Sequence, residues 1–194
     1  MNFYDIYAEK YYNKTIKALN SDNLNKFLED IPKDGVIVDL GCGSGRDTLY
    51  MKSKGYKNIL PIDASSGLIC EAYKNSGLKI LEADIRNYNY ALNYYSGIFA
   101  NASLLHLTNE EFLNVLPKLY RSLKQTGVLY VSLKPSKEGI IEETKNGRYF
   151  RYYTEKELKD IFYSLDIKNF EIWETKSTIE EGQDWINILI KKDV

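Results

Sequence analysis

The sequence predicts an α/β fold, with a mostly parallel sheet and helices on both of its faces. Short apolar patterns typical of strands alternate along the chain with longer patterns of helical period. A glycine-rich turn at residues 41–45 directly follows the first strand pattern, and Asp63 ends the second. Units of this kind build parallel sheets in which ligands bind at the carboxyl ends of the strands.

The elements follow one another in a single expected domain, residues 1–194, without repeats or linkers. A helical region covers residues 2–30 and ends at Ile31-Pro32. Strands are expected at residues 36–40, 59–63, 79–83, 98–102 and 128–133. Helices are expected at residues 46–53, 65–75, 109–123 and 155–164. Residues 170–175 and 185–190 are expected to close the fold as an antiparallel pair of strands.

Composition excludes several classes of partner. The formal net charge of −1 gives no global attraction for nucleic acid or an anionic membrane. The two cysteines, Cys42 and Cys70, offer neither a disulfide framework nor metal-ligand spacing. The amino terminus lacks a basic start with an apolar run, and no stretch is long enough to span a bilayer. We therefore expect a soluble cytoplasmic protein, a monomer or a homodimer, that binds neither metal nor membrane and for which nucleic acid is a disfavoured partner.

The glycine turn and Asp63 indicate a ligand that contains adenosine. Glycines at positions 41, 43 and 45 permit the positive φ angles that a strand needs to reverse into a helix beside a ligand. Asp63 follows Gly41 by 22 residues. This is close to the interval of about 20 residues at which a carboxylate meets the ribose in nucleotide-binding βαβ units. A purely structural turn remains an alternative, in which Asp39 caps the following helix.

Asp39 narrows the choice among adenosine ligands. A carboxylate two residues before the turn would repel a pyrophosphate, which the amino terminus of a helix otherwise attracts. The glycine rhythm is also G-x-G-x-G, with Arg46 where a dinucleotide-binding turn has its third glycine. A ligand that carries a cation at this position fits better.

The quoted residues resemble motif I of the class I S-adenosylmethionine-dependent methyltransferases, D-x-G-x-G-x-G. Four further segments, at the order and spacing of that superfamily, are residues 58–65, 81–85, 97–106 and 125–132. The resemblance covers almost the whole chain and is to small, single-domain members of the type 11/25-like kind. It implies a Rossmann-like sheet of seven strands, of which the last is antiparallel.

The resemblance also implies S-adenosyl-L-methionine as the cofactor and a small-molecule methyl acceptor. The residues that match cofactor-binding positions lie in the amino-terminal region, the glycine turn and the ends of three later strands: Tyr11, Asp39, Gly41, Cys42, Gly43, Gly45, Arg46, Asp63, Ala64, Ser65, Asp84, Ile85, Asn101 and Ala102. Asp84 has the alternative of capping the turn before Tyr88. Arg46, in the first turn of a helix, is expected to have an anionic partner, either the cofactor carboxylate, Asp47 or Asp84.

His106 is the only histidine and the candidate catalytic residue. It lies just beyond the fourth strand, at the edge that faces the transferable methyl group in the superfamily. With an ordinary pKa near 6.5, its side chain could accept a proton from the acceptor at neutral pH. The alternative is a packing role against the cofactor, or a hydrogen bond to a backbone carbonyl.

Two segments are expected to recognise the acceptor. Residues 1–30 form an aromatic helical lid, because their tyrosines resemble the Y-x-x-x-A-x-x-Y pattern found over the cofactor in many such enzymes. Residues 134–153 form an insertion in which arginines and a lysine could bind a carboxylate or phosphate between tyrosines. The substrate-binding candidates are Tyr7, Lys134, Arg148, Tyr152 and Tyr153. The alternative for the insertion is a hairpin whose aromatics pack on the sheet and whose arginines face water.

These features favour transfer of a methyl group to an oxygen or nitrogen of a small, possibly anionic, metabolite. Two alternatives stay open: methylation of a modified tRNA nucleoside, since the Arg-Tyr-Phe stretch at residues 148–153 offers stacking and phosphate contacts, and a non-catalytic module that only binds the cofactor. An NAD-dependent oxidoreductase is disfavoured by Asp39 and Arg46. The acceptor itself is not encoded in any motif, because this fold serves many substrates.

Overall fold

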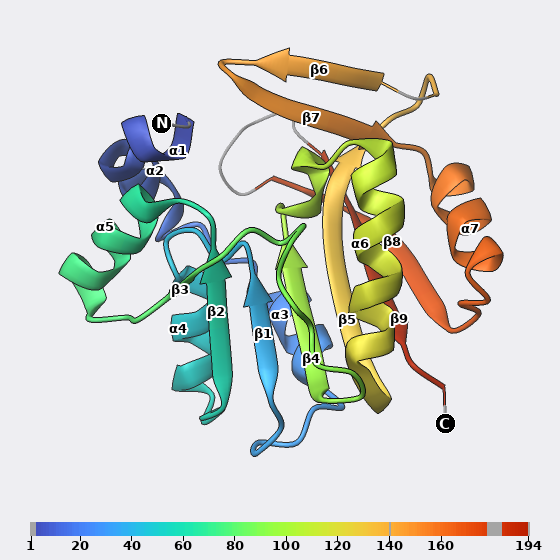
Figure 1. The fold of residues 1–194 in the computed structure, drawn as a ribbon, viewed down its shortest axis with the longest axis horizontal. Helices are drawn as coiled ribbons and strands as arrows, with labels where there is room; N and C mark the ends of the chain where they lie inside the picture. The colour runs from blue at the N-terminus through green and yellow to red at the C-terminus, as the bar shows by residue number, and fades with distance from the viewer. Residues whose placement is uncertain (1–2, 140, 178–183, 194) are drawn as a thin grey trace.

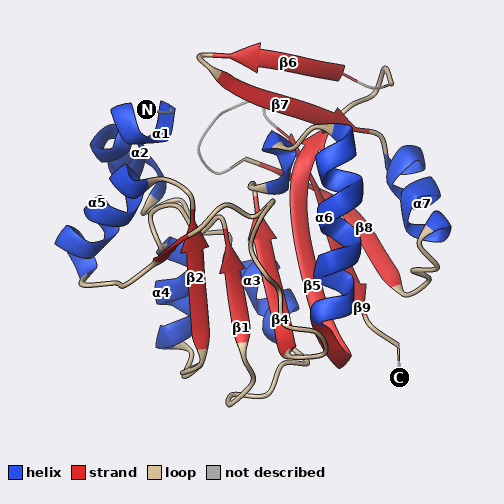
Figure 2. Cartoon of the chain, viewed as in Figure 1, coloured by secondary structure: helices blue, strands red, loops and turns tan. Residues whose placement is uncertain are grey.

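The computed structural model describes residues 3–139, 141–177 and 184–193. Figures 1 and 2 show an α/β fold in which helices cover both faces of a central sheet, as the sequence predicts. The helices are α1 Phe3–Ile6, α2 Ala8–Thr15, α3 Ser21–Leu28, α4 Arg46–Ser53, α5 Ser66–Ser76, α6 Asn109–Ser122 and α7 Glu155–Ser164, with the short 3-10 helix η1 at Leu104–His106. The strands are β1 Ile37–Leu40, β2 Ile59–Asp63, β3 Leu81–Glu82, β4 Tyr95–Asn101, β5 Leu123–Pro135, β6 Ile141–Lys145, β7 Arg148–Tyr153, β8 Phe170–Lys176 and β9 Asp184–Lys191.

The sheet has the strand order of a doubly wound fold. Strands β3, β2, β1, β4 and β5 lie side by side and run parallel. Strand β9 pairs with β5 in the antiparallel direction, and β8 pairs with β9. The expected closing pair and the antiparallel last strand are therefore confirmed. Strand order reverses between β1 and β4, and the carboxyl ends of these two strands meet at the upper edge of the sheet in Figure 1.

Two apolar clusters hold the layers together. One face of the sheet packs against α3 and α4, through Phe27, Met51 and Phe99 among other buried side chains. The other face packs against α6 and α7, through residues such as Leu116 and Phe162. Strand β9 serves both clusters, because successive side chains of a strand point to opposite faces.

The strands of the centre extend further than the sequence patterns suggest, and the edge strand is shorter. Strands β4 and β5 begin before residues 98 and 128 because each has neighbours on both sides. At the edge, β3 pairs with β2 through Leu81 and Glu82 alone, where a strand over residues 79–83 is expected. Helices α4 and α7 have the predicted bounds.

The helical region expected over residues 2–30 is divided into three helices. The chain leaves helical geometry at Tyr7, and Asn20 caps α3 by accepting a hydrogen bond from the backbone N–H of Asn23. Helix α3 packs against one face of the sheet, with Phe27 fully buried, so it belongs to the core rather than to a lid. Only α1 and α2 lie at the upper edge, against α5, where Figure 1 shows them above the ends of the strands.

The insertion at residues 134–153 continues β5 and forms a hairpin across the upper edge of the sheet (Figure 1). Strands β6 and β7 pair antiparallel around a turn at Asn146 and Gly147, both of which have positive φ. The end of β5 pairs with the end of β7, through Lys134 and Tyr152. The hairpin is thereby fixed above η1. Of the helices in the described part of the chain, none combines the length and apolar character that crossing a bilayer requires.

Candidate functional site

The glycine turn after β1 is shaped by positive φ angles and by close neighbours. Gly41, Gly43 and Gly45 have φ values of 72°, 54° and 75°. A Cβ at Gly41 would lie 2.4 Å from Cβ of Ser103, and one at Gly45 would lie 2.3 Å from a methyl group of Leu78. Around Gly43, by contrast, no atom lies within 4 Å of such a Cβ. Gly41 and Gly45 are therefore in positions where the neighbouring side chains leave no room for a Cβ, whereas the surface of the turn at Gly43 is open to a ligand.

The side chain of Asp63 joins the glycine turn after β1 to the loop after β2. One carboxylate oxygen accepts the backbone N–H of Gly43 at 2.7 Å, and the other accepts that of Ser65 at 2.9 Å. Burial raises the pKa of Asp63, while these backbone donors lower it. Ser65 in turn caps α5 by accepting the N–H of Leu68. The predicted neighbours Asp63, Ala64 and Ser65 thus form one structured loop beside the glycine turn.

Asp39 lies beneath the glycine turn rather than on its surface. Its side chain is 1% exposed and accepts a hydrogen bond from the hydroxyl of Thr48 at 2.5 Å. Burial, followed by the negative charge of Asp47, raises the pKa of Asp39 to about 7. Asp39 is thus enclosed beneath the turn, whereas the sequence analysis expects its carboxylate to face the ligand.

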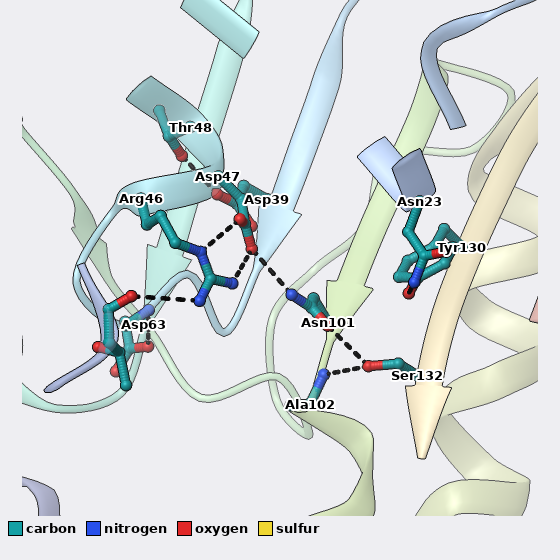
Figure 3. A network of polar contacts seen from close by, with 12 residues as sticks. Asn23, Asp39, Arg46, Asp47, Thr48, Asp63, Asn101, Ala102, Tyr130 and Ser132 are labelled. Atoms are coloured by element: carbon teal, nitrogen blue, oxygen red, sulfur yellow. Dashed lines mark hydrogen bonds and ion pairs between the residues drawn. The ribbon is translucent and has the colours of Figure 1, made fainter. Parts of the chain in front are cut away.

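The carboxylate that reaches the open side belongs to Asp47, in the first turn of α4. It accepts two hydrogen bonds from Arg46, both at 2.7 Å, and one from the side-chain amide of Asn101 at 2.9 Å. The amide oxygen of Asn101 accepts from Ser132 at 2.7 Å, and Ser132 accepts the N–H of Ala102 at 2.8 Å. Figure 3 shows these side chains in a row from α4 to β5. Among the partners expected for Arg46, the structure shows Asp47 and not Asp84.

A cavity of about 150 Å³ lies against this row. Seven of its lining residues are expected cofactor contacts: Tyr11, Gly41, Cys42, Gly43, Arg46, Asn101 and Ala102. The other lining residues are not among the expected contacts. Asp47 and Lys176 are charged, Ala18 and Trp185 are apolar, and the rest are neutral and polar: Thr15, Asn20, Asn23, Ser44, Tyr130, Ser132, Thr175, Ser177 and Asn187. Asn23, Tyr130 and Asn187 hydrogen-bond to one another at 2.8–3.0 Å beneath the cavity. In β5 and β9 the only sequence signal is a polar group within an otherwise apolar run, and Asn23 stands among other polar residues of α3.

Asp84 and Ile85 follow β3 on the other side of the glycine turn. The Asp84 carboxylate accepts the backbone N–H of Arg86 and pairs with its guanidinium, which lowers the pKa of Asp84. The backbone carbonyl of Asp84 accepts from Asn87 and Tyr88, so the turn before Tyr88 is present and begins at Asp84, as the alternative interpretation predicts. Ile85 is partly buried against the main apolar cluster. Both residues are outside the lining of the cavity.

His106 uses both ring nitrogens. Nδ1 lies 2.7 Å from the backbone carbonyl oxygen of Tyr149, and Nε2 lies 2.8 Å from the hydroxyl of Tyr4. Since a carbonyl can only accept, the proton of the neutral ring is on Nδ1, and Nε2 accepts from Tyr4. Burial lowers the pKa of His106, and the cations of Arg148 and Lys134 act in the same direction. The hydrogen bond to a backbone carbonyl, which is the alternative role predicted for His106, is thus present. Nε2 remains the basic atom of the ring.

Three of the five candidate residues for acceptor binding, Arg148, Lys134 and Tyr152, lie near His106. The Arg148 guanidinium lies over the rings of Phe3 and Phe150, at 4.1 and 4.9 Å from their centroids. Lys134 lies over Phe150 at 4.2 Å and donates a hydrogen bond to the hydroxyl of Tyr152. Arg148, Lys134 and His106 thus surround the ring of Phe150, and Tyr152 contacts Lys134.

Tyr153 and Tyr7 lie elsewhere. Tyr153 is fully buried, with its ring 5.1 Å from that of Phe112 in the core, so its expected contact with substrate is wrong. The alternation of β7 explains this, because residues two apart share a face and Tyr153 is on the inward one. Tyr7 is 49% exposed at the break between α1 and α2, and its ring lies 4.8 Å from that of Phe3.

Comparison with known proteins identifies related chains. A family model described as "Methyltransferase domain" matches residues 37–127. The phosphoethanolamine N-methyltransferase of Plasmodium falciparum is 27% identical over 175 residues, covering 84% of this chain and 64% of that protein. The carboxy-S-adenosyl-L-methionine synthase of Vibrio parahaemolyticus is 33% identical over 109 residues, covering 50% of this chain and 43% of that protein. The chain thus spans less than two thirds of the length of either relative.

Solved structures share the fold over nearly the whole chain. The 1,6-didemethyltoxoflavin-N1-methyltransferase of Burkholderia thailandensis, crystallised with S-adenosylhomocysteine, superposes with a TM-score of 0.77 at 15% identity, covering 98% of this chain and 84% of that one. A SAM-dependent methyltransferase of Methanosarcina mazei superposes with a TM-score of 0.70 at 20% identity, covering 86% of this chain and 96% of that one. With the family match and the sheet topology, these similarities agree. Together they are consistent with a class I S-adenosylmethionine-dependent methyltransferase, which is what the sequence resembles.

Proposed function

We propose that the protein transfers a methyl group from S-adenosylmethionine to an oxygen or nitrogen of a small, anionic metabolite. The observation that carries the anionic character is Arg148. Its Nε is buried without a hydrogen-bond partner, and its guanidinium lies over Phe3. None of the ion pairs found among the described residues joins Arg148 to a carboxylate. A guanidinium without a carboxylate at a partly buried site is a ready partner for a carboxylate or phosphate.

The cofactor side is supported by the glycine turn and its neighbours. When bound, S-adenosylmethionine supplies an electrophilic methyl group on a sulfonium. The open surface of Gly43 and the loop built around Asp63 suit the nucleoside part, and the cavity beside Arg46 and Asp47 suits the amino-acid part. These residues lie where strand order reverses, the usual binding position on open α/β sheets.

His106 is the candidate base. An ammonium or hydroxyl acceptor must lose a proton before or during methyl transfer, and Nε2 carries the lone pair. The lowered pKa of His106 keeps that lone pair available at neutral pH. In the present geometry the Tyr4 hydroxyl fills the position opposite Nε2. An acceptor therefore reaches Nε2 through Tyr4 or after Tyr4 moves aside.

The name of one sequence relative supports an acceptor class for this chain. That relative is named for phosphoethanolamine, a small amine that carries a phosphate. The structure from Burkholderia thailandensis, which shares the fold, is named for the N1 position of 1,6-didemethyltoxoflavin. A nitrogen acceptor with an attached anion would use both His106 and Arg148, since the amine needs a base and the anion needs a cation.

The experiment measures release of S-adenosylhomocysteine from S-adenosylmethionine with three probes: phosphoethanolamine, ethanolamine and a short carboxylated amine. We expect turnover only with an anionic amine. Arg148→Gln should raise KM for that acceptor by on the order of tenfold or more, because a charge-assisted contact contributes about 1.5–3 kcal/mol. Arg121→Gln, at an exposed position in the last turn of α6, is the matched control.

The outcomes separate the alternatives. Equal turnover of ethanolamine and phosphoethanolamine would contradict the role of Arg148 in acceptor recognition. Binding of S-adenosylhomocysteine without turnover across a broad panel of acceptors, small molecules and tRNA included, would favour a non-catalytic module. Turnover with tRNA alone would replace the small molecule by a modified nucleoside.

A further inference from the structure

The two arginines of β7 point to opposite faces of the strand, because they are three residues apart. Arg148 lies at the acceptor side, with its guanidinium over the ring of Phe3. Arg151 instead pairs with α7, and its side chain is only 1% exposed. Its guanidinium forms ion pairs with Glu157 in the first turn of α7 and, at 3.4 Å, with Glu142 of β6. Arg151 thus joins both strands of the hairpin to a helix that packs on the sheet.

The part of β7 that carries Arg148 overhangs the body of the sheet. In the described sheet, β7 pairs with β5 at Tyr152 and Tyr153, whereas from Arg148 to Arg151 its strand partner is β6. The Tyr149 carbonyl that faces Nδ1 of His106 belongs to this overhanging part. Figure 1 shows β7 crossing above the upper edge of the sheet and leading into α7. The position of the overhanging part therefore depends on side-chain contacts of the hairpin.

We infer that Arg151 is a positioning residue, which fixes β7 against α7 through Glu157. With β7 held there, the Tyr149 carbonyl keeps the proton of the neutral His106 ring on Nδ1, and Arg148 stays at the acceptor side. The hydrogen bond that one ring nitrogen of a histidine makes decides which nitrogen carries the proton. The inference rests on the proposed roles of His106 and Arg148, and it makes acceptor recognition depend on an ion pair outside the site.

The energetics of a buried ion pair favour this role over a purely stabilising one. Taking an arginine and a carboxylate out of water costs free energy that their attraction offsets only in part. Replacing such a pair by apolar side chains of similar volume therefore often leaves stability unchanged or raises it. The guanidinium of Arg151 is planar and rigid, so two carboxylate partners define its orientation. The pair is thus better suited to fix the direction of β7 than to stabilise the fold.

His106 is the only histidine, so its ring nitrogens give isolated NMR signals in untagged, ¹⁵N-labelled protein. At about pH 8, where the ring is neutral, the unmodified protein should show the proton on Nδ1. The double variant Arg151→Met with Glu157→Leu should unfold at about the same urea concentration. Its His106 ring should nevertheless populate both tautomers. KM for phosphoethanolamine should rise by roughly tenfold, while affinity for S-adenosylhomocysteine stays within about twofold.

Tyr56→Phe is the control for a general loss of stability. Tyr56 is buried between α4 and β2, and its hydroxyl donates to the backbone carbonyls of Leu28 and Ile31. The variant should unfold at lower urea and leave the His106 tautomer and KM unchanged. Glu157→Gln keeps the size of the side chain but removes its charge. This milder variant should change the tautomer and KM in the same direction as the double variant.

An unchanged His106 tautomer in the folded variants of the pair, or an unchanged KM where turnover is measurable, would overturn the inference. The same spectral change in Tyr56→Phe would also overturn it, because the tautomer would then follow stability alone. If the double variant does not fold, the result with Glu157→Gln decides. If the unmodified protein turns over no acceptor, the proposed function fails, and the tautomer in the variants still tests the role of Arg151.

Discussion

The hydroxyl of Tyr4 lies 2.8 Å from Nε2 of His106, although 102 residues separate them in the chain. This contact joins α1 to η1 at the end of β4. Arg148 extends it, because its guanidinium lies over Phe3 and Tyr4 at 4.1 and 5.6 Å. Asp5 fixes the other side of α1 by accepting from Ser65 at 2.8 Å. Helix α1 therefore connects the loop beside Asp63 with the hairpin above His106.

Tyr4→Phe is expected to loosen α1 and to lower kcat/KM for the acceptor by on the order of tenfold, because it removes one hydrogen bond of about 1–1.5 kcal/mol at the acceptor side. Hydrogen exchange of α1 amides should accelerate as well. Tyr73→Phe, on the exposed face of α5, should change neither quantity. Unchanged exchange of α1 in Tyr4→Phe would show that this contact does not hold the helix in place.

Gly41→Ala is expected to cost more stability than Gly43→Ala, whereas Gly43→Ala is expected to affect ligand affinity directly. At Gly41 the new methyl group collides with Ser103, which with the positive φ should cost about 3 kcal/mol in urea unfolding. At Gly43 only the positive φ is unfavourable, so the cost should be about 1 kcal/mol. Gly43→Ala should nevertheless weaken S-adenosylhomocysteine more than its stability loss suggests, because its methyl group projects into open space. Unchanged affinity in Gly43→Ala would place the ligand elsewhere.

Asp39→Asn is expected to stabilise the protein above neutral pH. Burial raises the pKa of Asp39 to about 7 in the folded protein, whereas in an unfolded chain it is about 3.9. The folded state thus binds the proton more tightly, and the stability this gives is present below pH ~4 and is lost as the pH rises through ~7. Asparagine carries no such charge. Thermal unfolding should show a stabilisation on the order of 1–3 kcal/mol at pH 8 that diminishes toward pH 5, whereas a difference independent of pH would contradict the assignment.

Tyr130→Phe is expected to destabilise the protein by about 1–3 kcal/mol in urea unfolding. The Tyr130 hydroxyl donates to Asn187 at 2.8 Å and accepts from Asn23 at 3.0 Å, and all three side chains are buried. Its removal leaves two buried amides with fewer partners than they need. A double variant with Asn187→Leu should recover part of the loss, and strictly additive losses would show that the three side chains are not coupled.

The elements that position the site could be predicted from local sequence. The glycine turn, β2 and α4 each carry their signal within a few residues, and their bounds in the structure agree with it. His106 could be placed at the end of the fourth strand for the same reason. The three hydrogen-bonded side chains that line the cavity, Asn23, Tyr130 and Asn187, could not be predicted in this way. They come from α3, β5 and β9, and they come together only because of the order of the strands in the sheet.

Two further features depended on geometry that no short motif encodes. The register of β7 against β5 decides that Tyr153 points into the core while Tyr152 remains beside Lys134. At the glycine turn, the sequence pattern directs attention to Asp39, but the turn covers that carboxyl and presents Asp47 instead. The spacing between a carboxylate and a glycine in the sequence does not determine on which side of the turn the carboxylate lies.

Isothermal titration calorimetry of the unmodified chain with S-adenosylhomocysteine and with NADH tests the central claim most directly. S-adenosylhomocysteine should bind at one site, and Asp63→Ala should weaken it severely because the loop beside Gly43 loses its carboxylate support. NADH should give no heat of binding. Tight binding of NADH without any of the sulfur nucleoside would contradict the account.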